Sequence, residues 1–253
     1  MTPDLYMRFV LKKYEYSVEG EAQAKTAITE LQALLKKWAG HYLITIEPTG
    51  SYAKGTRIKG GTDLDLLISL GPRTPFEMPK IYEHLFGWLK KQGFEPVRQN
   101  ISVGVRYKGL AVDLIPAKQE WGVSNNHYIF ETARNRTTRT NFTTHTELVR
   151  NSGWANEIKA LKIWRTVREL RFPSFCLELV VIDALRNRPK GLLVGNFEKL
   201  LAYLRDIFPG APFRDPANLE NIVSDDLLEH EKLAIADAAA ESLREKDWAR
   251  IIW

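Results

Sequence analysis

The run DLDLLISL at residues 63–70 constrains the fold most strongly, because acidic and apolar side chains alternate within a leucine-rich segment. Successive side chains of a β-strand point to opposite faces, so Asp63 and Asp65 point to the same side. Two carboxylates this close repel each other unless a cation lies between them. The run therefore predicts a strand that carries a metal site.

A glycine-rich turn, GSYAKG at residues 50–55, lies shortly before this strand. Gly50 allows the backbone to approach a phosphate closely, and Ser51 offers a hydroxyl and a backbone N–H. A helical turn through residues 52–55 would aim further amides at the same anion. Lys54, Arg57 and Lys59 add positive charge nearby. The turn predicts a phosphate cradle; the alternative is a tight loop that uses glycines only for its geometry.

A third carboxylate, Asp113, lies between apolar residues in VDLIPA. If this strand pairs beside DLDLL, three acidic groups converge, which is enough for two metal ions about 4 Å apart. Magnesium is the expected metal, because it prefers hard oxygen ligands together with substrate phosphates. The alternative places Asp63 and Asp65 on a solvated strand edge and Asp113 in a turn.

Hydrophobic periodicity predicts a mixed α/β half followed by a helical half, with a soft boundary in the region 120–145. The run HYLITIEPTG at residues 41–50 is expected to contain a short strand, and the two β-rich runs around Lys108-Gly109 are expected to form a hairpin. After about residue 120 the strand signals fade. Helices are expected at residues 22–39, 77–92, 154–170, 174–187, 192–208 and 226–247.

Composition narrows the class of protein. A formal net charge of +5 over 253 residues favours anionic partners such as nucleotides or nucleic acid. The single cysteine, Cys176, excludes a disulfide framework and a cysteine-rich zinc site. The N-terminal residues are charged too often for a signal peptide, and no apolar stretch is long enough to span a membrane. A cytoplasmic protein without a membrane partner is expected.

The motifs GSYAKGT, GTDLDLL and VDLIPA together resemble the signature of the DNA polymerase β-like nucleotidyltransferase superfamily. Within it, the chain is most similar to the branch that contains oligoadenylate synthases, class I CCA-adding enzymes and the bacterial cGAS/DncV-like nucleotidyltransferases (CD-NTases). The segments RTTRTNFTTHTELVRNSG, LKIWR, SFCLELVVIDAL and DPANLENIV extend the resemblance over most of residues 45–253.

The resemblance implies an α/β (α+β) fold in two domains. Residues 1–125 would form the nucleotidyltransferase catalytic core, with an N-terminal helix and a small mixed sheet. Residues 126–253 would form a helical domain that binds nucleotide and acceptor. The active site is expected in the cleft between the two domains.

The resemblance also implies roles for single residues. Asp63, Asp65 and Asp113 would be the catalytic metal ligands for two Mg²⁺ ions, with Mn²⁺ as a substitute. Asp113 would also assist deprotonation of the attacking hydroxyl. Gly50 and Ser51 would hold the β- and γ-phosphates.

Four residues of the second half would complete the nucleotide site by the same resemblance: Lys162 on the triphosphate, and Ser174, Phe175 and His145 near the nucleotide. Simpler interpretations stay open for each. Lys162 is also typical of a surface lysine whose stem lies on an apolar stripe, and Ser174 of a helix cap. Phe175 is also typical of a core residue, and His145 of a cap or surface residue. Arg134, Arg136 and Arg139 are expected in a solvated loop that could contact phosphate or nucleic acid.

The implied activity is template-independent, metal-dependent joining of nucleoside triphosphates into short cyclic or linear oligonucleotides, with release of pyrophosphate and a role in anti-phage signalling. The alternative is a terminal transferase that extends an RNA 3′ end, as CCA-adding enzymes do. The length of the chain favours the first, because CCA-adding enzymes of this branch carry extra RNA-binding domains. A non-catalytic nucleotide-binding module and small-molecule or protein nucleotidylation are less favoured. Expected partners are nucleoside triphosphates, a short oligonucleotide or RNA 3′ end as acceptor, and a regulator protein.

Overall fold

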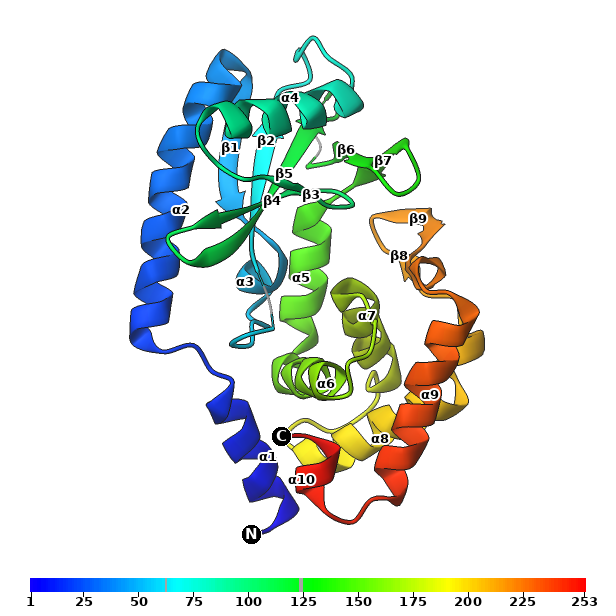
Figure 1. Ribbon diagram of the computed structural model, residues 1–253. Helices are drawn as coiled ribbons and strands as arrows, with labels where there is room; N and C mark the ends of the chain where they lie inside the picture. The colour runs from blue at the N-terminus through cyan, green and yellow to red at the C-terminus, as the bar shows by residue number, and fades with distance from the viewer. Residues whose placement is uncertain (62, 123–124) are drawn as a thin grey trace. The chain divides into compact units, whose positions relative to one another are not determined.

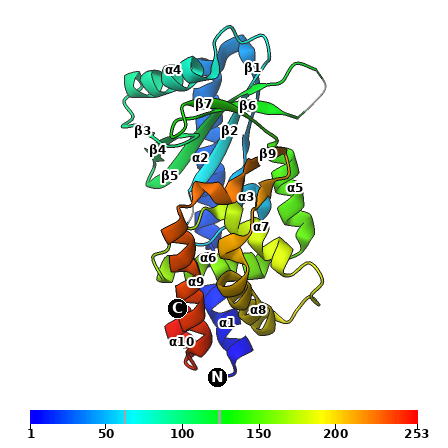
Figure 2. The same cartoon turned by 90° about the vertical axis from the view of Figure 1, so that its right-hand side faces the viewer.

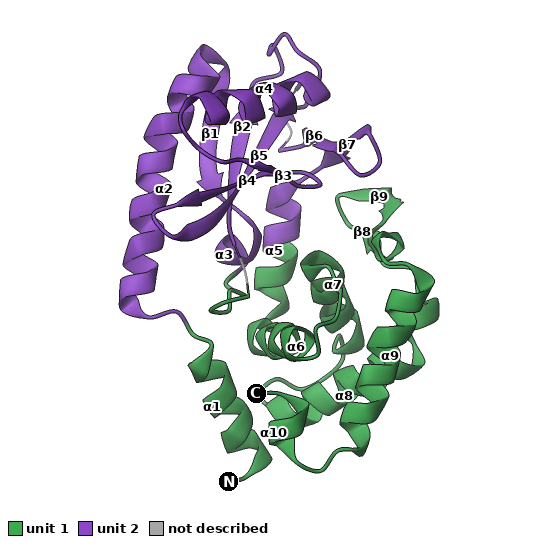
Figure 3. Cartoon of the chain, viewed as in Figure 1, with its two compact units in different colours: residues 1–15, 55–62, 147–253 green, residues 16–54, 63–146 purple. Residues whose placement is uncertain are grey.

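The computed structural model describes residues 1–61, 63–122 and 125–253, and Figure 1 labels its helices and strands. Contacts within the chain divide it into two compact units, which Figure 3 colours separately. The sheet unit comprises Tyr16–Lys54 and Asp63–Thr146. The helical unit comprises Met1–Glu15, Gly55–Thr62 and Glu147–Trp253.

The sheet unit is built on a seven-stranded mixed sheet. Its main path runs in the order β1-β2-β5-β4-β3, and β6 and β7 continue from β5. Only β2 and β5 pair in parallel, and every other described pair in this sheet is antiparallel. The strands are β1 (Leu43–Pro48), β2 (Leu64–Leu70), β3 (Val97–Arg98), β4 (Val103–Tyr107), β5 (Leu110–Gln119), β6 (His127–Glu131) and β7 (Arg136–Thr140). The expected small mixed sheet is confirmed.

Two amphipathic helices, α2 (Val18–Ala39) and α4 (Met78–Lys91), pack on one face of this sheet. The leucine and isoleucine side chains of β2 that alternate with its acidic residues lie in this core, together with Val112 and Leu114 of β5. The pleat therefore turns Asp65 and Asp113 to the opposite face. On the face that carries Asp65, Leu67 packs in a second, smaller apolar cluster with Ile115, Ala117 and Ile129.

The hairpin expected at Lys108-Gly109 is present between β4 and β5. Both turn residues have positive φ, 48° at Lys108 and 82° at Gly109. Such a pair matches the twist of the flanking strands. The hairpin fixes the register in which Gly104 lies opposite Asp113 and Arg106 lies opposite Ala111.

The expectation that strands end near residue 120 is wrong. β6 and β7 form a hairpin after that point, and β8 (Arg214–Asp215) pairs with β9 (Asn218–Ile222). The sequence of β7, RTTRT, is polar on both faces, so it carries no hydrophobic alternation. Its strand is supported by side-chain ion pairs instead: Arg136 contacts Glu131 at 3.0 Å and Arg139 contacts Glu120 at 3.1 Å. Arg136 and Arg139 thus lie on a strand and not in the expected loop, whereas Arg134 lies in the exposed turn of this hairpin, where it also contacts Glu131.

The helical unit has its own core of large side chains, with Trp164, Phe197 and Phe208 fully buried. Four of its helices lie close to the expected ranges, whereas no range was predicted for the first and the last helix of the chain. Its helices are α1 (Pro3–Lys13), α6 (Ala155–Val167), α7 (Ser174–Ala184), α8 (Leu193–Asp206), α9 (Glu229–Arg244) and α10 (Trp248–Ile251), with short 3₁₀ turns at Phe208–Gly210 and Val223–Asp226. In the sheet unit, a further 3₁₀ turn (Gly40–Tyr42) precedes β1 and α3 (Gly50–Lys54) follows it.

The two chain ends lie together in the helical unit, where α1 and α10 are neighbours (Figures 1 and 2). The Tyr6 hydroxyl donates to the carbonyl of Ile252 at 3.0 Å, and the Tyr14 hydroxyl donates to the carbonyl of Trp253 at 2.7 Å. These bonds attach the first helix of the chain to its last residues.

The compact units divide the chain differently from the domains expected at 1–125 and 126–253. Helix α1 and the segment 55–62 belong to the helical unit, and residues 126–146 belong to the sheet unit. The strands β6 and β7 extend the sheet past residue 125, and the boundary falls within α5 (Phe142–Ser152). The assignment of a catalytic and an acceptor-binding domain stays a prediction. Within the described ranges, we find no helix with the length and apolar character that crossing a membrane requires.

Candidate active site

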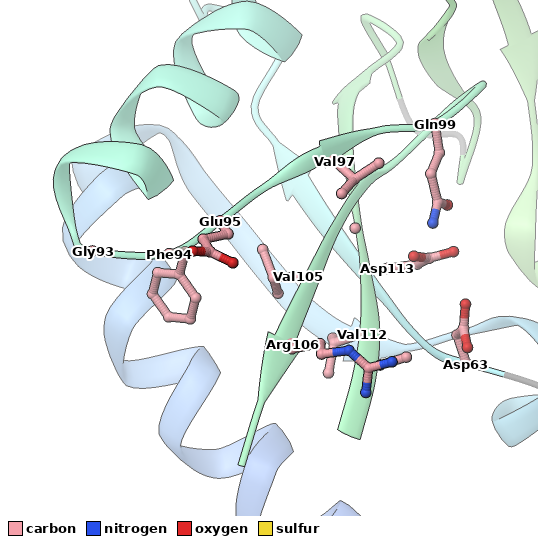
Figure 4. Close-up of a pocket in the computed structure, with 12 residues that line it drawn as sticks. Asp63, Gly93, Phe94, Glu95, Val97, Gln99, Val105, Arg106, Val112 and Asp113 are labelled. Carbon is pink, nitrogen blue, oxygen red and sulfur yellow. The ribbon is translucent and has the colours of Figure 1, made fainter. Parts of the chain in front are cut away.

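Two of the three predicted carboxylates are direct neighbours in the sheet. Asp65 of β2 and Asp113 of β5 are partners in the parallel register. Neighbouring strands lie about 4.8 Å apart, so the two side chains leave the same face side by side. Asp63 immediately precedes β2, and it lines the same pocket as Asp113. Figure 4 shows the carboxylates of Asp63 and Asp113 pointing toward a common space. The structure thus puts Asp65 and Asp113 side by side, with Asp63 on the wall of the pocket that Asp113 lines.

The glycine-rich turn lies directly against Asp65. Gly50 has a φ of 56°, a conformation that favours glycine. A Cβ atom at this position would lie 1.9 Å from Asp65 Oδ2 and 2.6 Å from its Cγ. The backbone N–H of Thr49 also donates to the carbonyl of Asp65 at 2.9 Å. The turn therefore packs directly against the Asp65 carboxylate, and only glycine fits at position 50.

Ser51 supplies a polar atom that has no partner. Its side chain is only 7% exposed, and its Oγ makes no hydrogen bond within the described part of the chain. A buried hydroxyl without a partner costs about 1–3 kcal/mol. A bound phosphate oxygen would satisfy it, so this atom fits the predicted cradle.

Asp113 has an unusual proton affinity in the metal-free protein. Burial, and then the negative charges of Asp65 and Asp63, raise its pKa from 3.8 to about 7. Hydrogen bonds from the side chains of Gln99 and Ser102 oppose the rise. A carboxyl with a pKa near neutrality can accept a proton from an attacking hydroxyl, and a nearby cation would favour its ionised form.

The donor set fits magnesium that is shared with a substrate. Among the residues that the structure describes, no three acidic, histidine or cysteine side chains gather closely enough to hold an ion by themselves. Magnesium is usually held by one or two carboxylates and completed by substrate phosphates and water. Asp63, Asp65 and Asp113 beside a free Ser51 hydroxyl match that arrangement. The number of ions and the metal ligands themselves stay predictions.

A pocket of about 700 Å³ opens beside the aspartates on the side of β4 (Figure 4). Sequence reasoning missed several of its residues, notably Gln99, Gly104 and Arg106. The hairpin register would have placed the last two, because a turn at Lys108-Gly109 pairs Gly104 with Asp113. The pocket is lined by Asp63, Gly93, Phe94, Glu95, Val97, Gln99, Gly104, Val105, Arg106, Ala111, Val112 and Asp113.

Lys162 is not the surface lysine that one interpretation expected. It is fully buried, and its Nζ lies 2.8 Å from Glu178 Oε1 and 3.0 Å from Thr56 Oγ1. Thr56 also donates to Glu178 at 3.2 Å. The ammonium therefore has an anionic partner inside the helical unit, which sequence reasoning missed. A role for Lys162 on the triphosphate stays a prediction.

The remaining predicted nucleotide residues have structural partners. Ser174 is the first residue of α7 and not its cap; its Oγ accepts a hydrogen bond from Arg165 at 3.0 Å. Phe175 is half-buried against the core of the helical unit. His145 is half-buried on α5. Lys54 belongs to the sheet unit, and Arg57 and Lys59 belong to the helical unit. Nucleotide contacts of these residues stay predictions.

Known proteins resemble this chain in sequence and in fold. No model of a protein family matches the chain. It is 22% identical over 198 residues to the Cyclic AMP-AMP-AMP synthase of Escherichia coli (strain MS 115-1), and the match covers 71% of this chain and 61% of the relative. The chain thus spans less than two thirds of the length of that curated relative.

Several solved structures share the fold. The E. coli MS115-1 CdnC:HORMA-deltaN complex matches with a TM-score of 0.70 and 21% identity, over 88% of this chain and 82% of that chain. The Bradyrhizobium diazoefficiens CD-NTase CdnG in complex with GTP matches with a TM-score of 0.74 and 14% identity, over 98% and 94%. The Cid1 poly (U) polymerase bound to MgATP matches with a TM-score of 0.68 and 13% identity, over 97% and 95%.

These neighbours confirm the polymerase β-like nucleotidyltransferase fold that the motifs predicted. The chain is thus similar in sequence to the Cyclic AMP-AMP-AMP synthase of E. coli and in fold to the CD-NTase CdnG.

Proposed function

We propose that this protein is a template-independent nucleotidyltransferase that joins nucleoside triphosphates into short cyclic or linear oligonucleotides and releases pyrophosphate. The observation that carries the proposal is the register pairing of Asp65 with Asp113 beside the Gly50–Ser51 turn. Two carboxylates next to a glycine turn with an unpartnered hydroxyl are the parts that metal-assisted phosphoryl transfer requires.

In the proposed reaction, a ribose hydroxyl of one nucleotide attacks the α-phosphorus of a triphosphate. The new P–O bond forms as the bond to the β-phosphate oxygen breaks, and pyrophosphate leaves with that electron pair. Gly50 and Ser51 bind the phosphate oxygens, and Asp113 accepts the proton of the attacking hydroxyl. Bound to the three aspartates, magnesium would neutralise the charge that develops on the phosphate oxygens.

The relatives support this class of reaction. One curated relative is named as a synthase of a cyclic adenosine oligonucleotide, and solved neighbours were captured with ATP, with GTP and with a triphosphate analogue. A neighbour captured with a HORMA protein supports a regulator protein as a partner. We extend the proposal to anti-phage signalling, in which the oligonucleotide would be the signal.

A second candidate is a terminal transferase that extends an RNA 3′ end. The observation in its favour is the likeness to the Cid1 poly (U) polymerase, which covers 97% of this chain. The two candidates share the chemistry and differ in the acceptor.

Product identification tests the proposal. The protein is incubated with each labelled triphosphate, with magnesium or manganese, with and without tRNA, then treated with phosphatase and analysed by mass spectrometry. Short phosphatase-resistant oligonucleotides from free triphosphates are expected. Label that appears only in RNA-sized material, and only when tRNA is supplied, would establish the terminal transferase instead.

A further inference from the structure

Arg106 lies on the same face of the sheet as the aspartates. It pairs with Ala111 in the β4–β5 hairpin, two residues from the pair of Gly104 with Asp113. The pleat therefore turns Arg106 and Asp113 to one face. The residues between Arg106 and the carboxylates are small, and both Gly104 and Ala111 line the pocket. Figure 4 shows the guanidinium of Arg106 directed toward the side of the pocket where Asp63 lies.

The guanidinium of Arg106 has no partner. It is exposed, and within the described residues it makes no hydrogen bond or ion pair. Other arginines of the sheet are engaged differently: Arg98 on the neighbouring strand β3 contacts Glu83 at 2.7 Å, and Arg139 on β7 contacts Glu120 at 3.1 Å. A guanidinium presents a fork of N–H donors that matches phosphate geometry. Arg106 is thus a phosphate-binding group that the protein itself leaves unused.

Its location separates it from the glycine-rich cradle. The sheet order β1-β2-β5-β4 puts Gly50 and Ser51 at the β1 end of the aspartates and Arg106 at the β4 end. Asp65 contacts the cradle, and Asp113 borders the pocket of Arg106. An anion held by Arg106 therefore lies on the opposite side of the aspartates from a triphosphate in the cradle.

The pocket suits a nucleotide. Its volume of about 700 Å³ falls within the range of small-molecule sites. Val97 of the edge strand β3 pairs with Gly104 and is 62% exposed, so it offers an apolar surface on the same face. Gln99 adds an amide beside Asp113. The pocket thus combines a cation, an apolar wall and polar groups next to the expected proton acceptor.

We propose that Arg106 binds a phosphate of the acceptor nucleotide and so brings the acceptor's hydroxyl to Asp113. This inference rests on the proposed function, because it assigns the second reactant of that reaction. The acceptor is then a nucleoside phosphate and not a bare nucleoside.

Binding without metal tests the inference apart from activity. Adenosine and adenosine 5′-monophosphate are titrated calorimetrically in EDTA into the wild type and the variants Arg106→Ala, Arg106→Lys, Arg98→Ala and Ser51→Ala. The wild type is expected to bind the monophosphate more tightly than adenosine by about tenfold or more, since charge-assisted bonds contribute about 1.5–3 kcal/mol. Arg106→Ala should abolish this preference, Arg106→Lys should retain part of it, and Arg98→Ala should leave it unchanged.

The opposite results are equally clear. The inference is overturned if the wild type does not bind the monophosphate more tightly than adenosine. It is also overturned if this preference is unchanged in Arg106→Ala, or if Ser51→Ala is the only variant that loses it. A melting curve shows whether the Arg106→Ala variant is folded. If it is not, the Arg106→Gln variant is used in its place. Absence of any nucleotide product refutes the proposed function, whereas the binding series still decides whether Arg106 holds a phosphate.

A kinetic arm links the site to the reaction. With ATP as the donor, Arg106→Ala should raise the KM for a monophosphate acceptor about tenfold or more while the KM for adenosine as acceptor stays unchanged. An equal loss with both acceptors would mean that Arg106 does not contact the acceptor phosphate.

Discussion

Gly50 and Asp65 approach so closely that a single added carbon at Gly50 would lie 1.9 Å from Asp65 Oδ2. The phosphate cradle and the carboxylate therefore cannot be changed independently.

Replacement of Gly50 by alanine tests this contact. Gly50→Ala should lower the free energy of unfolding by more than the roughly 1 kcal/mol expected from positive φ alone, because Asp65 must move. Gly55→Ala is the matched control, since Gly55 has a φ of 71° and open space around its Cα. Urea unfolding of both variants measures the difference. Equal destabilisation would mean that the close approach is not a constraint, whereas recovery in Gly50→Ala/Asp65→Ala would support it.

The proton affinity of Asp113 predicts the pH dependence of stability without metal. The pKa of Asp113 is about 7 in the folded protein and 3.8 in the unfolded chain. The folded protein therefore binds this proton more tightly than the unfolded chain, and protonation stabilises the folded state. The stability that results is complete below pH 3.8 and is lost as the pH rises through about 7, by at most about 4 kcal/mol. Asp113→Asn should flatten the decline.

Thermal unfolding in EDTA between pH 5 and 8 measures this effect for the wild type and Asp113→Asn. Magnesium should raise the melting temperature of the wild type most at the high-pH end, where Asp113 is ionised. If the melting temperature of the wild type depends on pH in the same way as that of Asp113→Asn, the pKa of Asp113 is not raised.

Replacement of Ser51 should affect the affinity for ATP but not lower the free energy of unfolding. Ser51→Ala removes a buried hydroxyl that has no partner, so the free energy of unfolding should stay the same or rise. The affinity for ATP with magnesium should fall about tenfold or more. Ser69→Ala is the control, because the buried Ser69 Oγ lies 2.8 Å from His127 Nε2, and its loss should lower stability by about 1 kcal/mol and leave ATP affinity intact. An unchanged ATP affinity in Ser51→Ala would place the cradle elsewhere.

The effects of replacing Lys162 and Glu178 on the free energy of unfolding should be strongly coupled. Lys162→Met leaves a buried carboxylate without its ammonium and should cost about 3–5 kcal/mol, whereas Lys162→Met/Glu178→Leu should recover much of the loss. Denaturant unfolding of the two single variants and the double variant gives the coupling free energy. Nucleotide affinity of the folded double variant then tests the triphosphate role: normal affinity would make Lys162 purely structural.

Much of the site follows from local pattern. Alternation in DLDLL placed Asp63 and Asp65 on the face away from the core, and the turn at Lys108-Gly109 fixed the β4–β5 hairpin. The sequence offered the pairing of β2 with β5 only as a condition, and the structure shows that the two strands do pair, in parallel. These features depend on side-chain periodicity and turn chemistry, which the sequence expresses directly.

Other features depend on tertiary contacts that no local pattern encodes. The strand β7 is polar on both faces and is supported by ion pairs with Glu131 and Glu120. Lys162 lies beside an apolar stripe in the sequence, yet a carboxylate of another helix neutralises it in the core. The contact of Gly50 with Asp65 joins two segments whose approach only the folded chain defines.

The most direct test of the central claim is pyrophosphate release by the wild type and by Asp63→Asn/Asp65→Asn, measured with magnesium and all four triphosphates. The account predicts steady release by the wild type, none by the variant, and a cooperative melting curve for both. Normal release by the folded double variant would contradict the claim that these carboxylates carry nucleotidyl transfer.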